Sequence, residues 1–273
     1  LRYISPVQIQ FTKMNGAGND FVLIDNRGGQ VSLSREQVAR VCHRQRGVGA
    51  DGLMLLKNAD GEGDWAWDFF NADGSDAEMC GNGARCFASY IQHTIGGEGA
   101  LSFETVCGLI RAEVGDTDVM VNLTAPQGLA LKETISTSDG DKAVHSLNTG
   151  VPHAVLFVEG ADAAMVSNLG EEIRYHDHFA PAGTNVNFVQ VLAEGHIRVR
   201  TYERGVGETL ACGTGVSASA MITAHLNGWA SPVAVDVLGG DTLRVAFDSD
   251  GDVFSNVHLT GPAVFVFEGT IAV

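Results

Sequence analysis

Residues 69–83 read FFNADGSDAEMCGNG, and residues 201–215 read TYERGVGETLACGTG. Each segment carries a cysteine followed by Gly-x-Gly, and Cys212 lies 132 residues after Cys80. Two matching thiols related by a pseudo-twofold axis would face a bound molecule from opposite sides. The pair therefore predicts an internal duplication with one reactive group in each copy.

Two further pairs of segments support the duplication. At the same offset, residues 18–24 (GNDFVLI) correspond to residues 150–156 (GVPHAVL), and residues 103–108 resemble residues 235–240. A repeat of this length has the size of a domain, whereas solenoid units have about 20–50 residues. The alternative is one large domain in which a short motif recurs by chance.

We expect the domains to comprise residues 1–135 and 136–273, with the boundary in the polar segment 132–142. Short strand-like segments bounded by glycine, asparagine or aspartate predominate in both halves. The segments after the two cysteines, 81–95 and 213–227, are predicted helices, and their small, mostly uncharged residues indicate burial on all sides. The expected fold class is α+β, with two pseudo-symmetric domains. Each domain would be a curved, mostly antiparallel or mixed sheet wrapped around a central helix.

The composition excludes several classes of protein. The chain has 273 residues, is 45% hydrophobic and carries a formal net charge of −16. This charge argues against a nucleic-acid partner, which requires clustered lysine and arginine. No apolar run approaches the roughly 18 residues that a membrane span needs. An odd number of cysteines and no secretory leader predict a cytoplasmic protein with reduced thiols.

A cysteine at the start of a helix is a candidate acid–base group. The helix dipole and unpaired backbone N–H groups lower the pKa of such a thiol. The glycines that follow leave those N–H groups open to a carboxylate, and Asn82 and Thr214 can add side-chain hydrogen bonds. We therefore interpret Cys80 and Cys212 as a pair suited to move a proton between the two faces of an α-carbon. Buried structural cysteines are the alternative, and it is our interpretation of the remaining three: Cys42, Cys86 and Cys107.

The two copies differ beside the cysteines. Glu203 and Arg204 occupy the positions of Asn71 and Ala72. A charged pair suits a zwitterionic amino acid, with the glutamate facing an ammonium group and the arginine a carboxylate; a surface ion pair is the alternative. His153 could orient a thiol or be an ordinary loop histidine. No dinucleotide, phosphate-binding or metal motif is present, so we expect no cofactor and no metal.

Five motifs together resemble the signatures of the diaminopimelate epimerase family: KMNGAGNDF (13–21), FNADGS (70–75), MCGNGAR (79–85), ERG (203–205) and ACGTG (211–215). The resemblance runs from about residue 11 to the C-terminus. It implies a cofactor-independent epimerase that interconverts LL- and meso-2,6-diaminopimelate, a step in the biosynthesis of lysine and peptidoglycan. It also suggests a homodimer.

The resemblance implies roles for the matching residues. Cys80 and Cys212 would exchange the roles of base and acid, with His153 and Glu203 as further catalytic residues. Two domains would close around the substrate. The substrate would be held by residues of both halves: Asn19, Asn71, Gly81, Asn82, Asn185, Glu203, Arg204, Gly213 and Thr214.

Three positions depart from the family pattern. Val151 stands where many members have a substrate-contacting asparagine, Asn15 where histidine is usual, and Gly52 where some members have glutamine. We expect none of them to touch the two thiols. The departures therefore bear on recognition of the distal end of the substrate, which does not react.

Three other hypotheses fit the same residues. A racemase of the proline-racemase type would use both thiols. Its substrate has no second amino-acid centre, so fewer groups would be available for Asn19, Glu203 and Arg204 to bind. A non-catalytic amino-acid-binding protein would bind its ligand without exchanging the α-hydrogen. A redox-responsive protein would join Cys80 and Cys212 in a disulfide.

Overall fold

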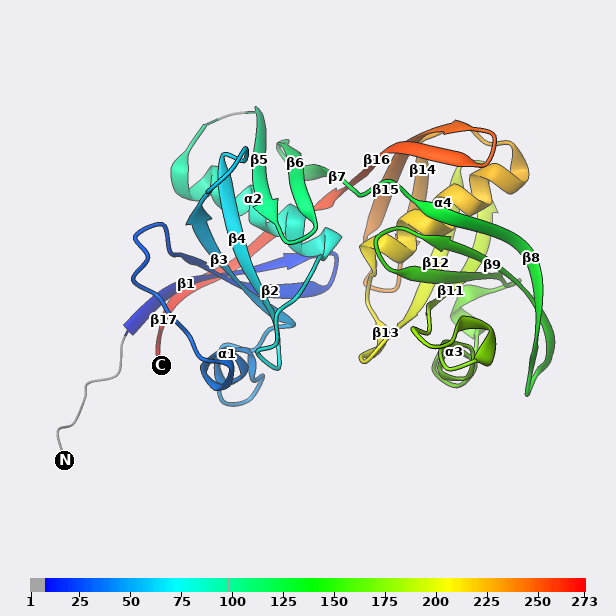
Figure 1. Cartoon of the computed structure of the whole chain (residues 1–273), viewed down its shortest axis with the longest axis horizontal. Coiled ribbons are helices and arrows are strands. Elements are labelled where there is room, and N and C mark those ends of the chain that lie inside the picture. The colour runs from blue at the N-terminus through cyan, green and yellow to red at the C-terminus, as the bar shows by residue number, and fades with distance from the viewer. Residues whose placement is uncertain (1–7, 98) are drawn as a thin grey trace. The chain divides into compact units, whose positions relative to one another are not determined.

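The computed structural model describes residues 8–97 and 99–273, and its contacts divide the chain into two units (Figure 1). The first unit comprises the residues up to Val121 together with Pro262–Val273, and the second comprises Asn122–Gly261. Residues 1–7, the start of the expected first domain, lie outside the described part. The units differ from the predicted division after residue 135 in two places. Residues 127–137 form a strand that pairs within the second unit, and the last strand of the chain pairs with the first and belongs to the first unit.

The first unit is a mixed sheet around a central helix. Its strands pair in the order β17-β1-β2-β3-β4-β5-β6-β7, and the β2–β3 and β4–β5 pairs are parallel while the other neighbours are antiparallel. Helix α2 (Gly81–Ile95) packs against β1, β2, β3 and β6. The strands are β1 (Gln8–Gly16), β2 (Asn19–Asp25), β3 (Gly52–Asn58), β4 (Trp65–Asn71), β5 (Gly99–Thr105), β6 (Gly108–Val114), β7 (Asp118–Asn122) and β17 (Val264–Ala272).

The second unit repeats this arrangement. Its strands pair in the order β8-β9-β10-β11-β12-β14-β15-β16, with β10–β11 and β12–β14 parallel and the other neighbours antiparallel. Helix α4 (Gly213–Asn227) packs against β9 to β12, β14 and β15, and β13 pairs with β12. The strands are β8 (Gln127–Thr137), β9 (Gly140–Asn148), β10 (Pro152–Phe157), β11 (Asn185–Ala193), β12 (His196–Glu203), β13 (Gly207–Thr209), β14 (Val233–Val237), β15 (Thr242–Asp250) and β16 (Val253–Pro262).

The two units therefore share one succession of strand directions. Helices α2 and α4 begin and end at the same offset of 132 residues and hold the same place in that succession. The register agrees as well, because Phe21 pairs with Gly52 across β2–β3, and His153 pairs with Asn185 across β10–β11. The structure confirms the predicted α+β fold and the internal duplication.

Both central helices are buried, as their composition predicts. In α4, which has no charged residue, the buried positions run from Gly213 to Ala224 with few exceptions. Helix α2 contains Arg85, which is fully buried. Its guanidinium donates to the Pro262 carbonyl (3.3 Å), the Gly81 carbonyl (3.4 Å) and Asn82 Oδ1 (3.0 Å). These acceptors satisfy the buried charge, which would otherwise cost several kcal/mol.

Two segments differ from the sequence-based expectation. The polar segment 132–142 is a β-hairpin, with Gly140 in the left-handed region (φ 83°) and Thr137 Oγ1 donating to the Gly140 carbonyl (2.7 Å). Its serines, threonines and aspartates lie in two paired strands and the turn that joins them, and not in a linker. Helix α3 (Val166–Arg174), which packs on β11 and β12, was not expected. Helix α1 (Arg35–Cys42) begins after Ser34, whose side chain accepts a hydrogen bond from the Gln37 N–H. No helix in the described ranges has the length and apolar character of a membrane span.

Candidate active site

Each central helix begins directly after its cysteine. Cys80 (φ −146°, ψ 116°) and Cys212 (φ −120°, ψ 107°) are the N-cap residues of α2 and α4, with extended backbone. The first N–H groups of a helix have no carbonyl partner within the helix and carry the positive end of its dipole. One of them, the Gly83 N–H, donates to Cys80 Sγ over 3.4 Å. Each thiol therefore lies at the N-terminus of a helix, at the start that the sequence predicts.

The second glycine of each Gly-x-Gly motif allows close packing behind the cysteine. A Cβ atom on Gly83 would collide with Met54 Cε, and one on Gly215 would collide with Asn187 Oδ1. At Gly83 the flexible end of the Met54 side chain would have to move, whereas at Gly215 the obstacle is an amide held by hydrogen bonds to the Ala154 carbonyl and Thr201. The glycine is therefore required more strictly in the second unit.

Asn19 contacts the first thiol. Its Oδ1 accepts from Cys80 Sγ (3.4 Å), and its Nδ2 donates to Asp51 Oδ2 (2.6 Å). A carboxylate can only accept, so Asp51 fixes the amide with its oxygen toward the thiol. The Arg44 guanidinium forms ion pairs with Asp51 (2.6 Å from Nη2 to Oδ1) and with the half-buried Asp20 (2.9 Å from Nη2 to Oδ1). The pKa of Asp20 falls to about 2 because its hydrogen bonds and ion pairs with Arg44 and Lys13 outweigh its burial.

The other expected ligands of the first unit are already engaged. Asn71 ends β4, and its Nδ2 donates to Ser75 Oγ (3.0 Å) and to the Asp76 carbonyl (3.2 Å). Asn82 follows Gly81 in the first turn of α2 and is fully buried. Because Asn82 Oδ1 accepts from the Arg85 side chain, this oxygen belongs to the helix interior. The backbone of the turn is thus better placed than the Asn82 side chain to meet a ligand.

Cys212 is held as a protonated thiol. It is 6% exposed, and its Sγ lies 3.5 Å from Thr214 Oγ1. Burial raises its pKa well above the usual range, and the Glu203 carboxylate, which accepts a hydrogen bond from the thiol, raises it further. Thr214 and the Gly215 N–H act in the opposite direction. The expectation of a lowered thiol pKa is therefore wrong for Cys212, since desolvation outweighs the helix N-terminus.

His153 is buried behind Thr214. Its Nε2 lies 2.9 Å from Thr214 Oγ1, and its Nδ1 lies 3.2 Å from Asn187 Nδ2. Burial, and then the charge of Arg204, lower the pKa of His153 to about 3. The imidazole is therefore neutral throughout the physiological range. The structure thus brings together Cys212, Thr214 and His153 within one unit.

Glu203 and Arg204 stand at the end of β12, beside the second thiol. Glu203 Oε1 accepts from Thr209 Oγ1 (2.7 Å), which orients the carboxylate. Asn185 is 4% exposed, and its Oδ1 accepts from the Arg204 backbone N–H (2.8 Å). In this structure Asn185 therefore fixes the backbone that carries Glu203 and Arg204.

Two of the three departures have local explanations. Asn15 Oδ1 accepts from the Gly18 N–H (2.8 Å) and shapes the turn before β2. A Cβ atom at Gly52 would lie 2.8 Å from Phe69 Cε2 and from the Phe70 carbonyl oxygen, so no side chain fits there without a shift. At Val151, the carbonyl accepts from the Thr149 N–H (3.2 Å), and the apolar side chain offers no substitute for an amide.

Sequence reasoning missed several residues that support these side chains: Asp51, Asn187, Thr201 and Thr209. Their roles depend on pairing between strands, which no local motif records. The offset of the repeat could have pointed to Thr201, because it places this residue over Phe69. A threonine at the position where the other copy has a phenylalanine is an unexpected substitution, and it could have indicated a polar role for Thr201.

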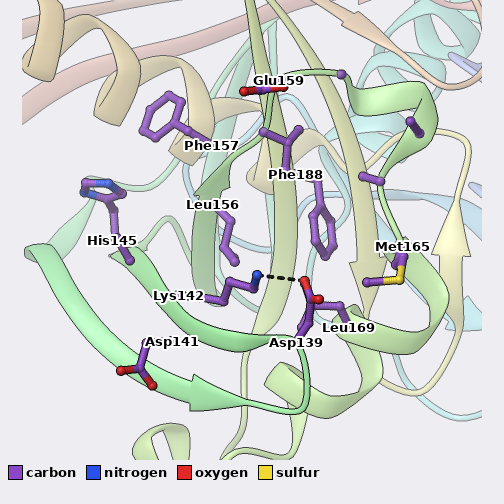
Figure 2. Close-up of a pocket in the computed structure, with 15 residues that line it drawn as sticks. Asp139, Asp141, Lys142, His145, Leu156, Phe157, Glu159, Met165, Leu169 and Phe188 are labelled. Carbon is purple, nitrogen blue, oxygen red and sulfur yellow. Dashed lines mark hydrogen bonds and ion pairs between the residues drawn. The ribbon is translucent and has the colours of Figure 1, made fainter.

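A cavity of about 420 Å³ lies elsewhere in the second unit, between β9, β10 and α3 (Figure 2). Leu156, Phe188 and Leu169 contribute apolar surface to it, and Lys142 pairs with Asp139 at its edge (2.7 Å). None of the candidate site residues lines it. Within residues 8–97 and 99–273, no three His, Cys, Asp or Glu side chains are grouped so as to hold a metal ion, and none of the five cysteines is in a disulfide bond.

Comparisons with known proteins agree on one family. The family model described as diaminopimelate epimerase matches residues 11–128 and 145–266. A diaminopimelate epimerase of Aquifex aeolicus is 45% identical over 281 residues, covering 97% of this chain and 98% of that protein. One from Nitrosospira multiformis is 39% identical, with 97% and 99% covered.

Solved structures share the fold at lower identity. A hydroxyproline epimerase from Agrobacterium vitis matches with a TM-score of 0.75 and 18% identity, covering 100% of this chain and 94% of that one. A Bacillus anthracis phenazine biosynthesis protein of the PhzF family matches with a TM-score of 0.74 and 15% identity, covering 98% and 100%. These proteins have the duplicated fold in common with this chain.

Proposed function

The chain belongs to the diaminopimelate epimerase family, and we propose that it interconverts LL- and meso-2,6-diaminopimelate with Cys80 and Cys212 as its acid–base pair. One observation carries the proposal: equivalent helices of two duplicated units each begin at a cysteine followed by Gly-x-Gly. A two-base epimerisation needs one proton-transfer group for each face of the α-carbon. It needs no cofactor when thiols can supply both groups.

The reaction consists of two proton transfers. One cysteine, as thiolate, takes the α-proton, and the other, as thiol, gives a proton to the opposite face. In the reverse direction the two exchange roles. The carboxylate becomes enolate-like in the transition state, and the backbone N–H groups of Gly81-Asn82 and Gly213-Thr214 stabilise that charge.

Glu203 links substrate binding to the ionisation of Cys212. Burial is the main reason that the pKa of the Cys212 thiol is raised, and the charge and hydrogen bond of Glu203 raise it further. An ammonium group of the substrate that pairs with Glu203 would neutralise this charge and remove its repulsion of a thiolate. The base would then form when an amino acid is bound. Arg204 would pair with a substrate carboxylate.

The remaining recognition is assigned to amide side chains. Asn19, Asn71 and Asn185 are the proposed ligands of the substrate, and His153 is a proposed catalytic residue. The apolar Val151 leaves one amide contact of the family to be supplied by another group. We place the reaction in the cytoplasm, in the biosynthesis of lysine and of the peptidoglycan precursor.

The proposal is tested by proton NMR of LL-diaminopimelate with the reduced protein in heavy water. We expect the α-hydrogen signal to disappear as deuterium enters, and the meso isomer to form. Exchange with proline but not with diaminopimelate would instead assign the chain to the proline-racemase type. Binding of diaminopimelate without any exchange would identify a non-catalytic binding protein.

We further propose that the chain forms a homodimer through β17. Four consecutive apolar residues of this strand are exposed: Val264 (53%), Phe265 (38%), Val266 (54%) and Phe267 (48%). A row of exposed apolar side chains on a strand is a typical interaction surface. Light scattering should give twice the mass of one chain for the wild type and the mass of one chain for Val266→Glu. A monomeric wild type would contradict the proposal.

A further inference from the structure

Three residues behind the second thiol are polar where the first unit has apolar ones. Across β10, β11 and β12 they stand in the same strand register as their counterparts across β2, β3 and β4. The equivalent pairs are Phe21 and His153, Met54 and Asn187, and Phe69 and Thr201.

In the first unit this set packs behind the helix start through apolar contacts. Phe21 and Phe69 meet edge to face with ring centroids 6.1 Å apart, and Met54 lies against Gly83. Apolar side chains are therefore sufficient to support a helix that begins at a cysteine in this fold. The polar set of the second unit needs another explanation, because burying polar groups stabilises a protein less than burying apolar ones.

The hydrogen bonds of Asn187 fix the orientation of its amide. Asn187 is fully buried, and its Nδ2 lies 3.0 Å from the Ala154 carbonyl oxygen. A carbonyl can only accept, so the amide nitrogen must be the atom on this side. Asn187 Oδ1 accepts from Thr201 Oγ1 (2.9 Å), which agrees with the same orientation.

The orientation of Asn187 determines the tautomer of His153. The amide nitrogen also lies 3.2 Å from His153 Nδ1. Because Nδ2 is a donor, Nδ1 must be the unprotonated acceptor, and the neutral ring carries its proton on Nε2. Nε2 then donates to Thr214 Oγ1 at 2.9 Å. The hydroxyl proton of Thr214 is consequently left to point elsewhere, and Cys212 Sγ is 3.5 Å from this oxygen.

We propose that Asn187 is a positioning residue for the reaction: it holds His153 as the Nε2–H tautomer, and through it directs the Thr214 hydroxyl as a hydrogen-bond donor to Cys212. Asn187 has no contact with solvent and acts through two other side chains. A donor aimed at sulfur stabilises the thiolate, which Cys212 must become when it acts as the base. The first unit has no counterpart, since Asn82, at the position of Thr214, is bonded to Arg85. This inference rests on the proposed function for its catalytic consequence, but the tautomer does not depend on it.

The test compares the wild type with Asn187→Asp in the full chain, using ¹⁵N-histidine NMR between pH 6 and 8. A carboxylate of the same shape cannot donate to Nδ1. We expect an Nε2–H ring in the wild type and an Nδ1–H ring in the variant. We also expect kcat to fall at least about tenfold, while KM changes less than about threefold.

Two further variants keep the test decisive. Asn187→Met introduces the residue of the first unit and removes the donor. It should leave His153 as a mixture of tautomers and also lower kcat. Thr223→Val is the matched control, because it removes another buried hydrogen bond of the same unit, from Thr223 Oγ1 to the Ser219 carbonyl (2.7 Å). It should leave the tautomer of His153 unchanged and change kcat by no more than about twofold.

The outcomes separate the two proposals. An Nδ1–H ring in the wild type would overturn the inference whether or not the protein epimerises diaminopimelate. A reversed tautomer with unchanged kcat would overturn the positioning role. An inactive wild type with an Nε2–H ring that reverses in Asn187→Asp would contradict the proposed function and leave the assignment of the tautomer standing.

Discussion

Replacement of either Cys80 or Cys212 by alanine is expected to lower kcat by about a thousandfold or more, in both directions of the reaction. Each direction uses one thiol as the base and the other as the acid, so neither direction can proceed normally with one thiol missing. The binding groups remain, and KM should change far less than kcat. The measurement is the rate of interconversion, followed by NMR and started separately from the LL and the meso isomer.

Cys107→Ala is the control for loss of a thiol as such. Cys107 is exposed, so its interpretation as a buried structural cysteine is wrong. It lies outside the Gly-x-Gly motifs, and its replacement should leave kcat within about twofold of the wild type. A large loss in only one of the two site variants would indicate a one-base mechanism. Retention of more than about a tenth of the wild-type rate by either variant would contradict the assignment of that cysteine.

The sequence predicted the duplicated fold and the two helix starts because their causes are local. A helix that is small and uncharged on all faces has to be buried, and glycines after a cysteine allow a helix to begin close to other side chains. Because the two motifs recur at the offset between Cys80 and Cys212, together they also predict that the chain is an internal duplication. Strand order followed from neither pattern, and the path of β17 back to β1 could not be predicted because it joins opposite ends of the chain.

The electrostatics of the second thiol could not be predicted from the motif. A helix N-terminus lowers the pKa of a cysteine, whereas burial raises it, and the sequence contains no measure of which effect is larger. In the structure, Cys212 is nearly inaccessible and Glu203 lies beside it, and both conditions arise from packing between β12 and α4. Identical Cys-Gly-x-Gly motifs can therefore place thiols in different environments.

The acid stability of the protein is expected to depend on His153. Its pKa is about 3 in the folded protein and 6.5 in an unfolded chain. Below pH 6.5 the unfolded state binds a proton that the folded state does not, so the free energy of unfolding falls as the pH falls. This contribution is present in full above pH 6.5 and is lost progressively toward pH 3. Between pH 8 and pH 5 the loss from this one residue should be about 2 kcal/mol.

His153→Phe provides the comparison, because Phe21 occupies the equivalent position in the first unit and the aromatic ring does not titrate. Chemical unfolding of both proteins at pH 8, 6.5 and 5 measures how the free energy of unfolding depends on pH. All other titrating groups are common to the two chains, so the difference between the two pH dependences isolates the histidine. The variant should lose about 2 kcal/mol less than the wild type between pH 8 and pH 5. Parallel pH dependences would mean that the folded state accepts a proton on His153, which is incompatible with a neutral imidazole held between Asn187 and Thr214.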